Sequence, residues 1–140
     1  MDALDLTDPD HVEVDRRFRS EIAIWLTTVS PEGQPQSTPV WFRWDGETFL
    51  LYSQPGRPKL TNIEANPKVS LHLVGDAKGE DIVTIEGTAA VDPSAPPGDQ
   101  IPEYIDRYLS LIEGFGWTPA SFAADYSVAV RVTPTRFRIL

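Results

Sequence analysis

The sequence contains no cysteine and only two histidines, His11 and His72. Without cysteine there is no disulfide framework, no thiolate metal ligand and no cysteine nucleophile. No His-Glu-x-x-His pattern supports a zinc site, and no Gly-x-Ser-x-Gly turn supports a serine triad. We therefore predict no metal site and no catalytic side chain. A chain free of disulfides also fits a reducing compartment.

Long hydrophobic runs are missing as well. The run from Ile22 to Leu26 is far shorter than the roughly 20 apolar residues that cross a bilayer. No Lys or Arg precedes Arg16, whereas a secretory signal begins with positive charge. We expect a cytoplasmic protein with no membrane partner.

Basic residues are scarce, with 12 Lys and Arg against 21 Asp and Glu, which gives a net charge of −9. A chain this acidic repels phosphodiester backbones, so nucleic acid is excluded as a partner. Basic residues nevertheless outnumber acidic ones from Gln36 to His72, and the segment after Asp125 contains no acid. Such basic islands suit a small anionic ligand.

Phosphate-binding glycine motifs are absent too, since neither a Walker loop nor Gly-x-Gly-x-x-Gly occurs. A chain without a nucleophile, metal ligands or a nucleotide motif has no reactive group of its own. If the protein is an enzyme, it therefore requires a bound cofactor that performs the chemistry while the protein binds and orients it.

The pattern of apolar residues predicts a disordered acidic tail over residues 1–10 and a single domain over residues 11–140. Strands dominate, and no alternation of strands and helices appears. The sequence therefore predicts a mainly β fold, a six-stranded antiparallel barrel with a few peripheral helices. The expected strands are Ile22–Val29, Pro35–Trp44, Thr48–Ser53, Val69–Leu73, Ile82–Val91 and Tyr126–Leu140. The expected helices are His11–Glu21, Pro58–Ala65, Ile101–Ile112 and a short one from Thr118-Pro119.

One candidate binding site is the turn that follows the third expected strand. Pro58 is suited to the first position of a helix, whose positive dipole end favours an anion. Charge-assisted hydrogen bonds there could hold a phosphate. The candidate residues are Ser53, Gln54, Arg57, Lys59 and Asn62. The alternative is that these are ordinary surface residues of a helix.

A second candidate lies in Thr38-Pro39-Val40-Trp41. Proline inside a strand removes a ladder donor, so Pro39 indicates a sheet edge or a bulge with exposed backbone groups. Such groups beside Trp41 suit the polar edge and flat face of a tricyclic ring. Packing of Trp41 in a core or an interface is the alternative. Val40, Phe42 and Trp44 are expected on the core face.

The order and spacing of these blocks resemble the pyridoxamine-phosphate-oxidase-like superfamily of flavin-binding split β-barrels, and in particular its short actinobacterial branch that uses the deazaflavin coenzyme F-420. The resemblance covers about residues 12–92 and the final strand. The blocks that carry it are Trp25–Val29, Pro31–Pro35, Thr38–Gly46, Tyr52–Gly56, Lys59–Ile63, Asn66–Leu71 and Ile85–Ala89.

The resemblance implies a homodimer with a cofactor in each groove between subunits. Lys59 and Asn62, with Ser53 and Arg57 beside them, match the phosphate side, and Thr38 to Trp41 match the strand that borders the ring. It also implies direct hydride transfer from the reduced ring to a small molecule, without an obligatory acid or base. Pyridoxamine-phosphate oxidases are longer at the C-terminus, so that activity is not expected.

Several functions remain open at this point. The resemblance favours hydride transfer from reduced coenzyme F-420 to an unsaturated or quinone-like small molecule. The alternatives are an FMN-dependent oxidoreductase of the same fold, and a non-catalytic carrier of flavin, deazaflavin or haem. His72 would be the haem ligand in the last case, although its place within an expected strand favours a structural role.

Overall fold

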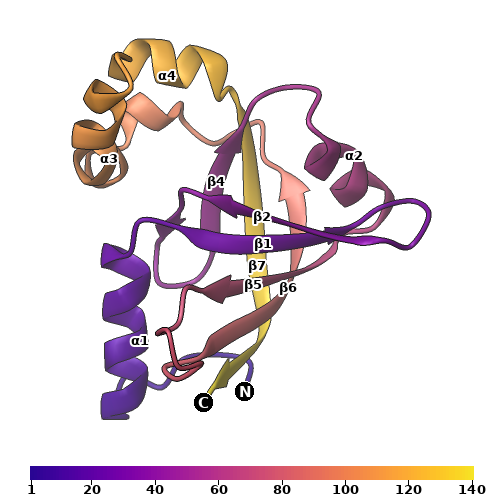
Figure 1. The fold of residues 1–140 in the computed structure, drawn as a ribbon, viewed down its shortest axis with the longest axis vertical. Helices are drawn as coiled ribbons and strands as arrows, with labels where there is room; N and C mark the ends of the chain where they lie inside the picture. The colour runs from indigo at the N-terminus through magenta and orange to yellow at the C-terminus, as the bar shows by residue number, and fades with distance from the viewer.

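The computed structural model describes all 140 residues and contains one curled sheet with helices around it (Figure 1). Neighbouring strands are all antiparallel, in the order β2-β1-β5-β6-β7-β4-β3. The strands are β1 (Ile24–Val29), β2 (Pro35–Val40), β3 (Arg43–Trp44), β4 (Phe49–Ser53), β5 (Lys68–Leu73), β6 (Val83–Val91) and β7 (Val128–Ile139). The helices are α1 (Pro9–Ser20), α2 (Pro58–Ala65), α3 (Pro102–Gly114), α4 (Pro119–Asp125) and the short 3-10 helix η1 (Gly98–Gln100).

The expected antiparallel split-barrel class is confirmed, but the sheet has seven strands where six were expected. The difference arises because the expected strand Pro35–Trp44 is interrupted after Val40. The Phe42 N–H donates to the Tyr108 hydroxyl at 3.0 Å, and Arg107 Nη1 donates to the Phe42 carbonyl at 2.9 Å. These hydrogen bonds from α3 satisfy the Phe42 backbone groups, which would otherwise pair with a neighbouring strand. The strand therefore ends at Val40, and the chain passes from β2 at one edge of the sheet to β3 at the other.

The expected division of faces along this segment is confirmed. Val40, Phe42 and Trp44 are buried, whereas Pro39 is exposed. Phe18 of α1 closes the barrel core, with its ring centroid 5.3 Å from that of Trp44. Because successive residues of an extended chain point to opposite sides, the alternation survives the interruption.

Helix α1 begins at Pro9, two residues before its expected start. The Asp8 carboxylate accepts a hydrogen bond from the Asp10 N–H and caps the helix. Pro9 and Asp10, which were expected in the acidic tail, are therefore helical. Earlier in the chain, Leu4 packs against the core, and the Phe137 N–H donates to the Met1 carbonyl at 2.6 Å.

The helices after β6 form a cap at the end of the barrel opposite the two chain termini (Figure 1). The buried stripe of α3 consists of Tyr104, Tyr108 and Ile112. Thr118 caps α4 and Pro119 occupies its first position, as expected from the sequence. This cap contains a second, smaller apolar cluster that includes Phe122. No helix has the length and hydrophobicity needed to span a bilayer.

Candidate functional site

An aromatic cavity of about 330 Å³ lies between strand β2, the start of α2 and the α3–α4 cap. Lys59 is its only charged lining residue. The lining residues are Thr38, Pro39, Val40, Trp41, Tyr52, Lys59, Tyr104, Phe115, Trp117, Phe122 and Tyr126. Flat apolar walls with few polar groups are typical of sites for small planar ligands.

The first wall of this aromatic cavity is the edge strand β2. Strand β2 pairs with β1 alone, with Pro39 opposite Trp25, so its other edge has no partner strand. The edge position predicted from Pro39 is confirmed. At the end of β2, the Trp41 ring stacks on the Tyr108 ring with centroids 4.5 Å apart and an angle of 8° between the planes. This stacking fixes the indole as part of the wall.

Lys59 places a positive charge at the aromatic cavity without a carboxylate partner. It is half-buried in the first turn of α2 and forms no ion pair. Burial lowers the pKa of Lys59 from 10.5, and the nearby Arg57 guanidinium lowers it further. The N-terminus of α2 also has no capping side chain, because Arg57 makes no such bond. An unpaired ammonium beside the positive dipole end of α2 favours an anion.

Three further residues singled out in the sequence lie at the end of β4 and in the loop between β4 and α2, and none of them lines the aromatic cavity. Ser53 is buried and its hydroxyl donates to the Gln54 carbonyl at 2.8 Å. Arg57 is exposed, and its Nε donates to Gln54 Oε1 at 2.9 Å. The Arg57 guanidinium has no acidic partner.

Asn62 also lies outside the aromatic cavity lining, although it follows Lys59 by less than one helical turn. Its side chain is 3% exposed. The Asn62 Nδ2 group donates to Thr28 Oγ1 at 2.9 Å and to Gln36 Oε1 at 2.8 Å. The side chain of Asn62 thus ties α2 to β1 and to β2.

Sequence reasoning missed the second wall of the aromatic cavity, which the cap supplies. Tyr104, Phe122 and Tyr126 come from α3, α4 and the segment after α4. The available signal was the concentration of aromatic residues between Tyr104 and Tyr126. The sequence predicted a helix over Ile101–Ile112 in this region, and within it Ile105 and Leu109 are half-buried.

The tyrosines around the aromatic cavity differ in what their hydroxyls bind. Tyr108 donates to the Ile22 carbonyl at 2.7 Å, and Tyr52 donates to the Pro96 carbonyl at 2.6 Å. Burial raises the pKa of Tyr52 to about 12, and burial raises the pKa of Tyr104 well above 10. These hydroxyls remain protonated at neutral pH, so they act as hydrogen-bond donors and not as bases.

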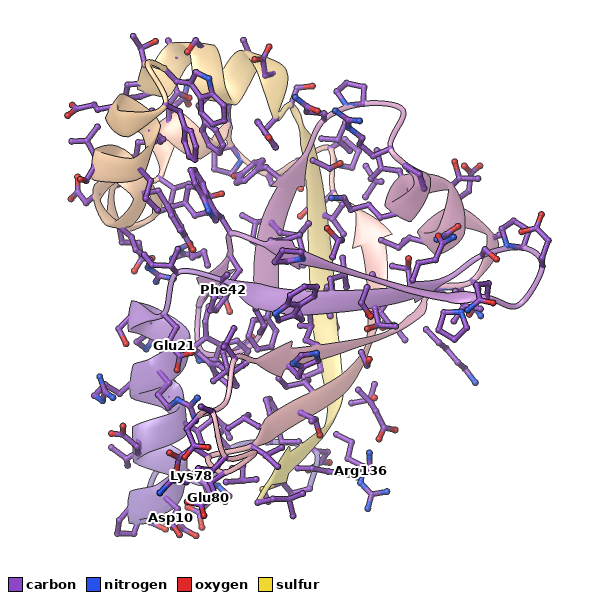
Figure 2. All side chains as sticks on the ribbon, viewed as in Figure 1. Asp10, Glu21, Phe42, Lys78, Glu80 and Arg136 are labelled. Atoms are coloured by element: carbon purple, nitrogen blue, oxygen red, sulfur yellow. The ribbon has the colours of Figure 1, made fainter.

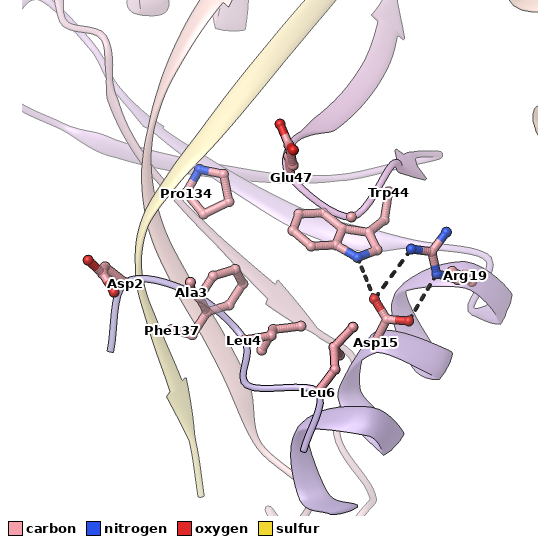
Figure 3. A pocket seen from close by; sticks show the side chains of 11 residues that line it. Asp2, Ala3, Leu4, Leu6, Asp15, Arg19, Trp44, Glu47, Pro134 and Phe137 are labelled. Carbon is pink, nitrogen blue, oxygen red and sulfur yellow. Dashed lines mark hydrogen bonds and ion pairs between the residues drawn. The ribbon is translucent and has the colours of Figure 1, made fainter. Parts of the chain in front are cut away.

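Other parts of the molecule carry less chemistry. No group of three or more His, Asp or Glu side chains could hold a metal ion. His72 stacks on Trp25, with centroids 6.1 Å apart, on the outer face of the sheet and outside the aromatic cavity lining. A second cavity of about 270 Å³ lies beneath the N-terminal segment (Figure 3). Its Asp15 is already bound to Trp44 and Arg19.

The fold is that of a split-barrel protein, and the aromatic cavity is its candidate site. The sequence pattern of the pyridoxamine 5'-phosphate oxidase family matches residues 11–140, so the chain belongs to that family. The superfamily resemblance inferred from the sequence is thereby confirmed.

Known proteins of several descriptions are similar to the chain. A pyridoxine/pyridoxamine 5'-phosphate oxidase from Bacteroides fragilis is 36% identical over 86 residues, which cover 60% of this chain and 36% of that protein. The chain thus matches about a third of that relative's length. The structure of an F420 reductase is 29% identical, with a TM-score of 0.63, and the match covers 89% of this chain and 94% of that one. The haem storage protein HutZ from Vibrio cholerae shares the fold, at 17% identity and a TM-score of 0.64, over 91% of this chain and 92% of that one.

Proposed function

We propose that the protein binds reduced coenzyme F-420 and directs its hydride to an unsaturated or quinone-like small molecule. The observation that carries this proposal is the unpaired Lys59 ammonium at the edge of an otherwise uncharged aromatic cavity. Such a site favours a flat ligand with an acidic end. The similarity to an F420 reductase along almost its whole length gives independent support.

The residues of the aromatic cavity fit the two parts of a deazaflavin. Its planar ring would lie along Thr38 to Trp41, where the unpaired edge of β2 offers backbone hydrogen-bonding groups. Its phosphate would lie near Lys59 and the uncapped start of α2. When bound in reduced form, the coenzyme supplies a hydride. The chain's contribution is then to bind, to orient and to exclude water.

The size of the aromatic cavity limits what can enter it. A volume of about 330 Å³ is at the lower end for ligand sites. We therefore place the acidic tail of the coenzyme outside the cavity, toward Arg57, and only its ring against the β2 wall, so that the cap side stays open to the reaction partner. Ser53, Gln54 and Asn62 do not line the cavity. They would support the part of the site that holds the acidic tail, because Ser53 and Gln54 shape the β4–α2 loop and Asn62 anchors α2.

We further propose that the binding groove is completed by a second copy of the chain. The outer face of β1, β2 and β5 carries mostly uncharged side chains, among them Trp25, Thr27 and Ser70. Thr27 and Ser37 satisfy each other through a hydrogen bond of 2.7 Å between their hydroxyls. Lys68 at the start of β5 is the charged side chain of this face, so a partner that leaves Lys68 at its rim covers the rest without burying a charge.

Titration of the purified protein with oxidised coenzyme F-420 tests the function. Trp41 and Trp117 line the aromatic cavity, so their fluorescence should be quenched to saturation at low micromolar concentration. Loss of one charge-assisted bond costs about 1.5 to 3 kcal/mol, so Lys59→Gln should weaken binding by about tenfold or more. Equal affinity in wild type and Lys59→Gln would overturn the proposal.

A matched variant separates a local effect of Lys59 from a change in net charge. Lys78 lies in the loop between β5 and β6, away from the cap (Figure 2). Lys78→Gln removes the same charge and should leave the affinity within about twofold. FMN titrated in parallel distinguishes the alternative cofactor: tighter binding of FMN than of coenzyme F-420 would favour an FMN-dependent oxidoreductase. Binding of coenzyme F-420 without turnover of any quinone or enone would favour a carrier.

A further inference from the structure

We propose that the Tyr104 hydroxyl donates a hydrogen bond to a carbonyl oxygen of the small molecule that occupies the α3–α4 side of the aromatic cavity. The inference rests on the proposed function, since it names the group that recognises the substrate of that reaction. It assigns the two walls different tasks. Lys59 and β2 bind the cofactor, and the cap binds a planar carbonyl compound.

The Tyr104 hydroxyl has no hydrogen-bond partner within the protein. Tyr104 is 1% exposed, yet its hydroxyl makes no hydrogen bond, unlike those of Tyr52 and Tyr108. Every fully buried polar side-chain atom of the chain does have a partner. The Tyr104 hydroxyl is therefore not fully enclosed by protein, and Tyr104 lines the aromatic cavity. An unsatisfied donor at a cavity is costly unless a ligand or water completes it.

The Tyr104 ring is held so firmly that its hydroxyl has a defined position. Its centroid lies 5.4 Å from that of Tyr52, 5.0 Å from Tyr108 and 6.2 Å from Phe122. Gly98 allows close packing on the remaining side, because a Cβ at that position would lie 3.3 Å from Tyr104 Cε1. A rigid donor binds a ligand with little loss of side-chain entropy.

The chemistry of the cap selects a carbonyl compound. The hydroxyl of Tyr104 is protonated at neutral pH, so it offers a donor to an acceptor atom. The surrounding cap residues Phe115, Trp117 and Phe122 are aromatic and uncharged, and they favour a flat ring. A quinone or an aromatic enone combines a flat ring with a carbonyl acceptor. An aromatic hydrocarbon would fill the same space but leave the hydroxyl unpaired.

Two probes of similar shape test this inference without the coenzyme. Menadione carries two carbonyl groups on a naphthalene frame, and methylnaphthalene carries none. Binding of each is followed by quenching of Trp41 and Trp117, in wild type and in Tyr104→Phe. We expect Tyr104→Phe to bind menadione about three- to tenfold more weakly, as for loss of one neutral hydrogen bond, and methylnaphthalene within about twofold of wild type.

Tyr52→Phe is the matched variant, because it removes a tyrosine hydroxyl from the same cavity that is already bound to the Pro96 carbonyl. Its affinity for menadione should fall less than that of Tyr104→Phe. Thermal unfolding serves as the check on folding, since Tyr104→Phe removes no bond within the protein. Equal loss of affinity for both probes, or for both variants, would overturn the role of Tyr104.

The two proposals fail in distinguishable ways. Menadione binding that is unaffected by Tyr104→Phe, together with normal binding of coenzyme F-420, would contradict the carbonyl contact alone. Carbonyl-dependent binding of menadione in a protein that ignores coenzyme F-420 would support the contact and contradict the proposed cofactor. Failure of wild type to bind menadione at all would contradict the contact.

Discussion

At Lys59 and Asn62, two residues of one helix meet opposite environments. Three residues apart, they were expected to share a face and a ligand. Asn62 is satisfied by Thr28 and Gln36 of neighbouring strands, whereas Lys59 has no partner. The spacing of two residues along a helix determines which way their side chains point. Whether each polar group is already hydrogen-bonded depends on the strands that pack beside it.

The bonds of Asn62 lead to a prediction about stability. Thr28 is 2% exposed, and its hydroxyl accepts a hydrogen bond from the Asn62 side chain. Asn62→Ala removes that donor, and the loss should lower the free energy of unfolding by about 1 to 3 kcal/mol. Urea denaturation measures the loss. Asn66→Ala, which removes only an exposed contact to the Lys68 N–H, should cost less. Equal midpoints for the two variants would contradict the structural role of Asn62.

At the scale of elements, α3 determines where the sheet splits. The Tyr108 hydroxyl donates to the Ile22 carbonyl and receives the Phe42 N–H, while the ring of Tyr108 supports Trp41. One helical residue thus fixes the chain before β1, ends the β2 segment and positions a cavity wall. This long-range contact, absent from any local pattern, explains why one expected strand became two.

The link between β6 and β7 leads to a prediction about acid stability. Hydrogen bonds from Ser94 and then from the Arg131 guanidinium lower the pKa of Asp92 from 3.8 to about 2. Between these pH values the unfolded chain binds more protons, so the stabilisation is present above pH 3.8 and is lost as the pH falls through 2. Asp92→Asn should therefore show a shallower loss of stability over this range. Thermal unfolding across the range measures the slope, and identical slopes would contradict the assignment.

At the scale of the whole molecule, the aromatic cavity and the outer sheet face share the edge strand β2. Thr38 lines the cavity, and Ser37 beside it lies opposite Thr27 on the outer sheet face. A partner subunit that covers this face would therefore also border the cavity. Binding and association are then expected to be coupled.

Association is tested by the mass in solution. We expect sedimentation to give twice the chain mass of 15.6 kDa. Thr27→Glu places a charge on the outer sheet face and should raise the dimer dissociation constant by about tenfold or more. Ser110→Glu, on the exposed side of α3, adds the same charge elsewhere and should leave the dimer intact. A monomeric wild type would contradict the proposed subunit groove.

Features that depend on neighbouring residues were predictable from the sequence. Pro58 starts α2 and Ala65 ends it, as expected, and Thr118 caps α4. The core face of Val40, Phe42 and Trp44 followed from strand alternation. The candidate residues Thr38 to Trp41 and Lys59 do lie at one cavity, although no local rule joins them.

The sequence by itself determined the mainly β, antiparallel barrel class, the start of α2 and the lack of metal-ligand and nucleophile motifs. These depend on residue types and on interactions within a few positions along the chain. Only the tertiary structure decided that Trp41, Lys59 and Tyr104 meet at one cavity, and that Asn62 is already bound elsewhere. Which side chains come together at a cavity depends on how elements that are distant in the sequence pack. Whether a polar group is free to bind a ligand depends on all the residues that surround it.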